Sequence, residues 1–194
     1  AVSCMAEAPI TGRRQLSLVS NASLSAAADK QYDDFLDQHK LSQDQAQTAL
    51  VKRVGMRIQK AVEGYFRAKG EAGRLRGYDW QFNLVESKDM NAFCMPGGRV
   101  VIYTGILPVT KDEDGLAVVM GHEIAHAVAN HHSERMSHLL LVQLGGAVLS
   151  QALKDKPKRT RALLMTAVGA GASVGFILPH SRQQEAEADE LGLI

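Results

Sequence analysis

The segment His122-Glu123-Ile124-Ala125-His126 lies in an apolar stretch, residues 116–136, that predicts a helix preceded by acidic N-cap candidates at 112–114. Residues four positions apart project from one face of a helix, so both imidazoles can bind a single metal ion. Glu123 is turned about 100° from His122, so its carboxylate can act on a water at the metal without being a ligand. These polar groups are costly to bury among apolar neighbours unless they bind something. The segment therefore predicts a metal site within a helical domain.

A further metal ligand is expected from the acidic stretch Glu185-Ala186-Glu187-Ala188-Asp189. Glu185 and Asp189 share one face of a helix that begins near Ser181, whereas Glu187 points elsewhere. One carboxylate can bind the metal, while the other accepts a proton from a ligand imidazole and determines its tautomer. We expect Zn²⁺, one ion per chain, because imidazole and carboxylate ligands suit it and three protein ligands leave a position for water.

Three of the histidines after the first motif lie close to it, and one of them, His132, has the spacing of the third histidine in metzincin peptidases. Those enzymes need a glycine midway to end the helix, whereas this chain has Ala129, a strong helix former. If the helix continues, His132 points away from the metal. We expect His131, His132 and His138 to lie on the surface or to contact the ligands from behind.

The rest of the chain predicts an α+β domain that is mostly helical and has a small β-sheet. Apolar residues recur at helical spacing between residues 41 and 66. Alternating apolar and polar residues predict a strand at 80–84, and β-branched residues predict another at 99–104, after the turn Pro96-Gly97-Gly98.

The composition excludes some classes of function. Lys and Arg number 22 against 21 Asp and Glu, a net charge of +1, and aromatic residues make up 5%. We therefore expect no nucleic-acid partner. The two cysteines, Cys4 and Cys94, are too few for a disulfide framework or a cysteine-based zinc site.

Three separate motifs, in order, resemble the HtpX-like and CAAX-prenyl-protease-like zinc metallopeptidases, in particular the periplasmic branch that contains BepA and LoiP. The resemblance spans roughly residues 32–192 and lies in residues 91–98 with 103–105, residues 122–126, and residues 179–192. It implies a gluzincin, a zincin-type metalloprotease domain, in which His122, His126 and Glu185 bind zinc and Glu123 is catalytic. It also implies a zinc-dependent endopeptidase that hydrolyses protein or peptide substrates, in protein quality control of the cell envelope.

Substrate is expected to bind along the strand at 99–104, which we predict to be the edge of the sheet beside the zinc helix. A substrate chain can pair with an exposed strand through its backbone, and glycines allow close approach. An interior strand paired on both sides is the alternative. The candidate substrate-binding residues are Gly97, Gly98, Val100, Val101 and Ile102.

The first residues, Ala1-Val2-Ser3-Cys4, resemble the end of a bacterial lipoprotein signal, with Cys4 as the lipidated residue. The alternative is an arbitrary start with a free thiol. Residues 1–28 are expected to form a tether, because 5–28 are rich in Ala and Ser, and residues 29–194 to form the metallopeptidase domain, incomplete at its C-terminus. These expectations describe a periplasmic lipoprotein that contacts a membrane only through its lipid.

Two alternatives to a periplasmic peptidase remain open. One is a zinc-bound chaperone or assembly factor with suppressed proteolysis, since no oxyanion donor is identified beyond the candidates His180 and Arg182. The other is an integral membrane protease that uses residues 139–178 as a hairpin. The apolar stretches 139–153 and 162–178 are shorter than the roughly 20 residues that cross a bilayer, so we expect buried helices or helices that cover the site.

Overall fold

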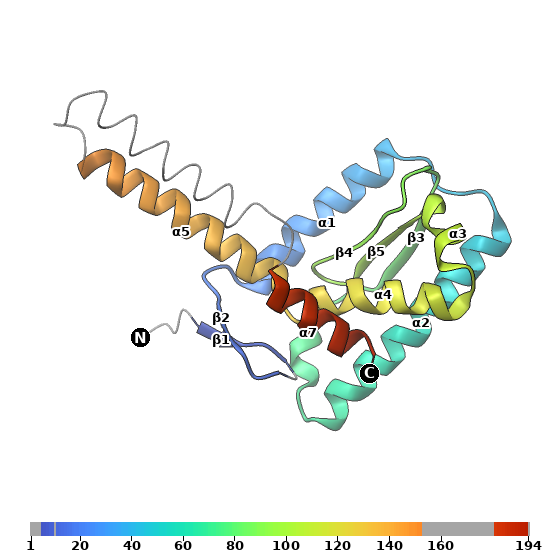
Figure 1. Ribbon diagram of the computed structural model, residues 1–194, viewed down its shortest axis with the longest axis horizontal. Helices are drawn as coiled ribbons and strands as arrows, with labels where there is room; N and C mark the ends of the chain where they lie inside the picture. The colour runs from blue at the N-terminus through green and yellow to red at the C-terminus, as the bar shows by residue number, and fades with distance from the viewer. Residues whose placement is uncertain (1–4, 10, 153–180, 194) are drawn as a thin grey trace.

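The computed structural model describes residues 5–9, 11–152 and 181–193 (Figure 1). The chain is mostly helical with two small sheets, which confirms the predicted α+β class. The shorter connecting elements are the 3₁₀ turns η1 (Ala72–Leu75) and η2 (Thr104–Ile106) and the helix α3 (Leu107–Thr110).

The main sheet has three strands in the order β3-β5-β4. β3 (Gln81–Val85) runs parallel to β5 (Arg99–Tyr103), and β4 (Ala92–Met95) runs antiparallel to β5. Both strands predicted from the alternation and the β-branched run are therefore present.

Helices cover both faces of this sheet, which explains why β5 is buried from Arg99 to Ile102. α2 (Gln45–Ala68) and α4 (Glu113–Val128) pack on the face that carries Phe82 and Val100. α1 (Asn21–Gln38) packs on the opposite face, where Tyr32 contacts the cluster that holds Val101. Successive strand residues point to opposite faces, so Val100 and Val101 belong to two different cores.

β5 is the central strand, so the prediction that residues 99–104 form the sheet edge is wrong. The turn before β5 folds β4 back along one side of it, while β3 pairs along the other side. Val100, Val101 and Ile102 are fully buried. The carbonyl groups of Gly97 and Gly98 accept hydrogen bonds from the backbone N–H groups of residues 79 and 81. The strand that ends the sheet beside α4 is β4.

The helix predicted over 116–136 is two helices. α4 begins after the N-cap Asp112, whose side chain accepts a hydrogen bond from the N–H of Gly115, and it ends at Val128. Asn130 has a φ of 62°, and α5 (His131–Ala152) starts at the next residue. Asparagine tolerates this left-handed conformation better than most residues, so it ends the helix although Ala129 favours continuation. The chain turns here, and this turn decides where His131 lies.

The N-terminal residues form a packed part of the domain, which corrects the expected tether. β1 (Met5–Glu7) pairs antiparallel with β2 (Arg14–Leu16), and we call residues 5–16 the N-terminal hairpin. The segment after it is bound to α5: the N–H of Leu18 donates to Ser137 Oγ at 2.8 Å, and Ser133 Oγ donates to the carbonyl of Val19 at 2.7 Å. Ser20 then caps α1. Cys4 lies outside the described residues.

α5 extends away from the rest of the molecule (Figure 1). Among the described residues, no helix is both long and apolar enough to cross a membrane. The second apolar stretch predicted from the sequence, residues 162–178, and His180 lie outside the described residues.

Candidate active site

α4 and α7 (Arg182–Gly192) pack closely against each other, and small residues make this possible. A Cβ atom at Gly121 would lie 2.9 Å from the carbonyl oxygen of Gly192, so only glycine fits there. The same interface holds a buried cluster formed by Ala125, Ala129, Ala188 and Leu191. α7 begins with a capping box between Ser181 and Gln184, as expected for a helix that starts at Ser181. The acidic face of α7 is thereby brought against the histidines of α4.

This packing brings His122, His126 and Glu185 together. One ligand atom from each lies within 4.8 Å of the others. Nε2 of His122 and Nε2 of His126 are each 3.5 Å from an oxygen of Glu185. The three residues that the sequence motifs single out therefore surround one point, where a metal ion can sit.

Asp189 determines the tautomer of His122. Its Oδ1 lies 2.9 Å from His122 Nδ1. A carboxylate can only accept here, so the proton is on Nδ1 and the lone pair of Nε2 is directed at the ligand group.

The donor set fits zinc. Nε2 of His122 and Nε2 of His126 are 3.0 Å apart. Two nitrogen lone pairs at this separation beside a carboxylate repel one another, and a shared cation removes that repulsion. Two imidazoles and one carboxylate are a common zinc donor set with a coordination position left for water. The predicted cofactor is thus supported by the chemistry of the site.

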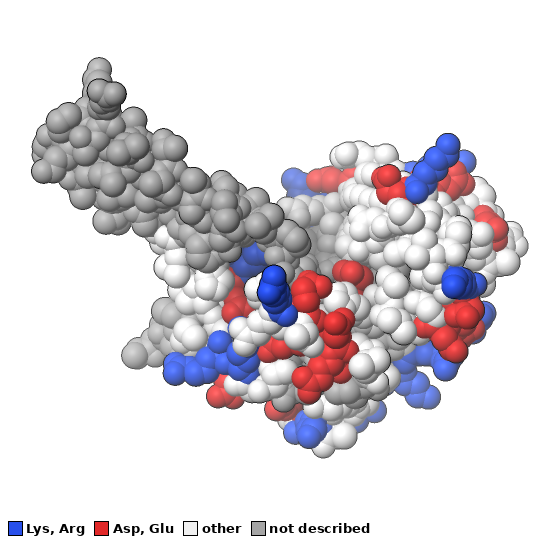
Figure 2. All heavy atoms as spheres, in the orientation of Figure 1, with Lys and Arg blue, Asp and Glu red and all other residues white. Residues whose placement is uncertain are grey.

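Glu123 lies next to this group without belonging to it. Burial raises the pKa of Glu123 to about 7, and the nearby carboxylate of Glu185 adds to the rise. Glu123 lines a cleft of about 440 Å³ together with His122, one of the three metal-binding candidates. The cleft is lined by Val118, Val119, His122, Glu123, Ala188, Asp189, Gly192 and Leu193. Acidic side chains gather over α7 beside it (Figure 2).

A buried cluster lies behind His126, and of its members only His131 was expected as a residue that could contact the ligands from behind. His131 is fully buried, and its Nδ1 lies 2.8 Å from Nδ1 of His126. Its other nitrogen lies 3.1 Å from Glu187, which accepts hydrogen bonds from Arg13. Arg13 also donates two hydrogen bonds to Glu134. We call Arg13, His131, Glu134 and Glu187 the Arg13 cluster.

The electrostatics of the Arg13 cluster favour its charged form. Burial raises the pKa of Glu187 and of Glu134. The hydrogen bonds from Arg13, a second hydrogen bond from Thr11 or Gln184 respectively, and the charge of Arg13 together outweigh burial, so both pKa values lie below the ordinary range. The two carboxylates in turn raise the pKa of Arg13. The sequence signal for this cluster was weak: Asn130 marks the turn that returns His131 to His126, and Glu187 was correctly expected to point away from the metal.

Other predicted site residues lie elsewhere. His132 and His138 are not part of the metal-binding group among the described residues. Arg182, a candidate oxyanion donor, is exposed in the first turn of α7. None of the predicted substrate-binding residues in 97–102 lines the cleft, because that strand is in the middle of the sheet.

Comparison with known sequences places this geometry in a family. The sequence profile described as Peptidase family M48 matches residues 52–194, which include α4 and α7 with all three metal-binding candidates. The chain belongs to peptidase family M48. Metallopeptidases of family M48 use zinc, so membership and the grouping of the three residues confirm the predicted cofactor.

Similarity to individual M48 relatives extends beyond the profile. The chain is 32% identical over 189 residues to the mitochondrial metalloendopeptidase OMA1 of Schizosaccharomyces pombe, covering 96% of this chain and 50% of that protein. It is 31% identical over 192 residues to human OMA1, covering 96% of this chain and 35% of that protein. The β-barrel assembly-enhancing protease of Escherichia coli is 33% identical over 121 residues, 59% of this chain and 24% of that protein. The chain spans half or less of the length of these relatives.

These matches correct two expectations. The relatives that match 96% of the chain are named as mitochondrial enzymes, so the predicted location, a periplasmic lipoprotein, is wrong. The resemblance holds at the level of family M48, whereas the relative from the branch favoured by the sequence motifs matches a smaller part of the chain.

Proposed function

We propose that this chain forms the core of a zinc-dependent endopeptidase that hydrolyses peptide bonds in protein substrates. The observation that carries the proposal is the grouping of His122, His126 and Glu185 around one point, with His122 and Glu123 lining a cleft. His122, His126 and Glu185 would hold the ion, with Asp189 orienting His122.

Bound zinc would supply a Lewis acid that activates water and polarises the scissile carbonyl. Glu123 accepts the proton of the attacking water on its carboxylate and returns it to the leaving amine. Burial raises the pKa of Glu123 in the metal-free chain, which makes its carboxylate a stronger base for the first step. Hydrogen-bonded Asp189 keeps the proton of His122 on Nδ1 throughout.

Substrate backbone is proposed to pair with β4. The N–H of Tyr103 donates to the carbonyl of Asn91. Hydrogen-bonded pairs alternate along an antiparallel ladder, so the backbone groups of Phe93 and Met95 also point toward β5. The backbone groups of Ala92 and Cys94 therefore point to the other side, where β4 has no partner among the described strands. An extended peptide can add there as a further strand.

Cleavage of unfolded casein by this chain tests the proposal. We expect cleavage that stops with a chelator and returns with zinc. A chain that binds zinc stoichiometrically but cleaves nothing would contradict the proposal and favour the zinc-bound assembly factor. Suppression of client aggregation by Glu123→Gln, measured in parallel, identifies that alternative. A role in protein quality control stays a prediction, for which misfolded substrates are the relevant test set.

A further inference from the structure

We propose that Arg13 is a positioning residue for the metal site, which acts from the N-terminal hairpin through Glu187 and His131 to hold the zinc ligand His126 in place. The inference rests on the proposed ligand set. It concerns how that set is kept in position by a part of the chain more than a hundred residues away in sequence.

His126 cannot rely on solvent for its orientation. Its side chain is 3% exposed, against 25% for His122. The ring can bind zinc through Nε2 only with the proton on Nδ1, and the atom that faces Nδ1, at 2.8 Å, is Nδ1 of His131. His131 must therefore accept there, which places its own proton on Nε2.

That proton on His131 needs an acceptor, and Glu187 provides it. The distance from His131 Nε2 to Glu187 Oε2 is 3.1 Å. One set of tautomers satisfies these two contacts: His126 donates to His131, and His131 donates to the carboxylate of Glu187. The orientation of a zinc ligand thus depends on a correctly placed Glu187.

Arg13 holds the carboxylate of Glu187 in that position. Glu187 is 6% exposed, and a buried carboxylate without a charged partner is strongly unfavourable. Arg13 Nε lies 2.9 Å from both oxygens of Glu187, and Thr11 of the same hairpin donates to Oε1 at 2.6 Å.

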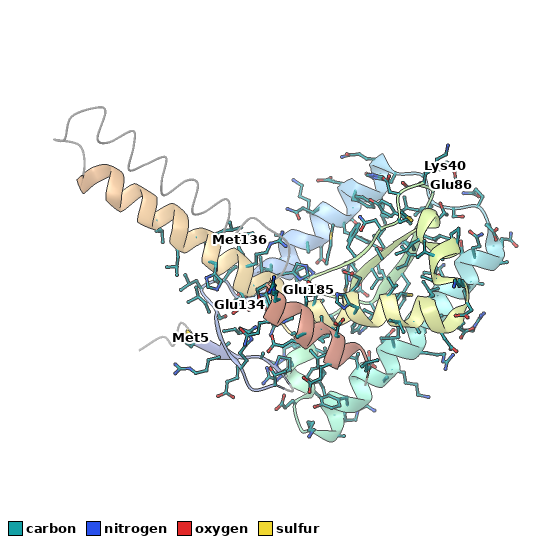
Figure 3. All side chains as sticks on the ribbon, in the orientation of Figure 1. Met5, Lys40, Glu86, Glu134, Met136 and Glu185 are labelled. Atoms are coloured by element: carbon teal, nitrogen blue, oxygen red, sulfur yellow. The ribbon has the colours of Figure 1, made fainter. Side chains whose placement is uncertain are left out.

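The same guanidinium joins three elements. Its Nη1 and Nη2 donate to the oxygens of Glu134 in α5 at 2.7 and 2.8 Å, and Glu134 also accepts from Gln184 of α7 at 2.7 Å. Figure 3 labels Glu134 on α5 and Glu185, the neighbour of Gln184, on α7. The planar guanidinium matches two carboxylates at once, which the ammonium group of lysine cannot do in the same geometry. Docking of the hairpin and geometry of the zinc site are therefore coupled.

Zinc affinity of the full chain tests the coupling. Zinc is removed, and the dissociation constant is measured by competition with a chromophoric chelator, with thermal unfolding of the metal-free protein as the check on folding. Outer partners of zinc ligands typically change metal affinity by about 10- to 100-fold, and we expect a loss in this range for Arg13→Ala. Arg14→Ala is the matched control, because Arg14 is the next residue of the N-terminal hairpin and is exposed. The zinc affinity of this variant should stay within about twofold of that of the unaltered chain.

A double-mutant cycle shows whether Arg13 acts through His131. His131→Phe should weaken zinc binding as much as Arg13→Ala, and adding Arg13→Ala to His131→Phe should change affinity by less than about twofold. The visible spectrum of the cobalt-substituted protein should change in both single variants and not in Arg14→Ala. If Arg13→Ala fails to fold, Arg13→Lys takes its place throughout the cycle.

Two results would overturn the inference: a folded Arg13 variant with unchanged zinc affinity, or a full additional loss when the Arg13 change is combined with His131→Phe. The ligand set fails separately. If Glu185→Ala binds zinc as well as the unaltered chain, the proposed function is wrong. If Glu185→Ala weakens zinc binding but Arg13→Ala does not, only this inference is contradicted.

Discussion

Gly121 of α4 and Gly192 of α7 meet backbone to backbone, and the position of Glu185 relative to the two histidines depends on that contact. A Cβ atom built at Gly192 would lie 3.0 Å from the backbone nitrogen of His122, and one at Gly121 would lie 2.9 Å from the carbonyl oxygen of Gly192. Any side chain at either position must separate the helices that carry the metal ligands.

Gly121→Ala should therefore destabilise the protein and weaken zinc binding. Alanine normally stabilises a helix by about 1 kcal/mol relative to glycine, but overpacking of this contact should cost about 1–3 kcal/mol. Gly64→Ala is the control, because Gly64 is an exposed position in α2 with nothing near its Cβ, and it should stabilise the protein. Urea unfolding and zinc titration measure both effects. Equal stabilisation by the two changes would show that α4 and α7 are not in this contact.

The chain should bind one zinc ion, and Glu185→Ala should weaken binding by at least about 100-fold, because it removes a ligand. Asp189→Ala should cost about 10- to 100-fold, since it removes the partner of His122 Nδ1 and not a ligand. Glu190→Ala, exposed on the same helix, is the control. Metal analysis gives the zinc stoichiometry, and chelator competition gives the dissociation constants. Unchanged zinc binding by Glu185→Ala would refute the ligand set.

Glu123→Gln should retain zinc and lose proteolysis. The same change should stabilise the metal-free protein at pH 7 by about 1–3 kcal/mol, because burial raises the pKa of Glu123 to about 7 and each pKa unit corresponds to about 1.4 kcal/mol. A glutamate whose pKa is higher in the folded chain than in the unfolded chain destabilises the fold as the pH rises from the unfolded pKa toward 7. Glutamine does not titrate, so the variant does not have this pH-dependent loss of stability. Casein cleavage and urea unfolding at pH 5 and 8 test the two effects. Undiminished cleavage would exclude Glu123 as the base.

Docking of the hairpin should be lost in acid. Burial alone would raise the pKa of Glu134, but hydrogen bonds from Arg13 and Gln184 hold this pKa below 4.5. Because the folded pKa is the lower one, Glu134 stabilises the fold above about pH 4.5 and loses that effect as pH falls through the folded value. Urea unfolding of the metal-free chain between pH 6 and 3 should show a decline that is shallower in Glu134→Gln. Asp37→Asn, at an exposed carboxylate of α1, should keep the full decline.

Pairing of substrate with β4 should be sensitive to the backbone of the substrate. A peptide in which one amide N–H near the scissile bond is replaced by an ester oxygen loses a strand hydrogen bond, at a cost of about 1 kcal/mol, so we expect KM to rise about fivefold with kcat little changed. Scanning the ester along the peptide should show alternation, since every second N–H faces β4. A uniform response at all positions would contradict strand pairing.

Local sequence determined the helix of the metal site and the roles of its faces. Spacing of four residues between His122 and His126 places both rings on one side of α4 whatever the rest of the fold does, because the helical period is a property of the backbone. The same holds for Glu185 and Asp189 on α7, and the β-branched run correctly indicated a strand at β5. These features depend on neighbours within a few residues, which the sequence shows directly.

Tertiary structure alone decided which strand is at the edge of the sheet and what lies behind the ligands. A β-branched run does not show how many partners a strand has, so β5 was predicted at the edge but lies in the centre. The N-terminal segment, rich in small residues, could be expected to be a tether. Arg13 nevertheless lies between Glu134 and Glu187, because those carboxylates converge there only after α5 and α7 have packed. Charge pairing across more than a hundred residues has no local periodicity, so only the folded chain could reveal it.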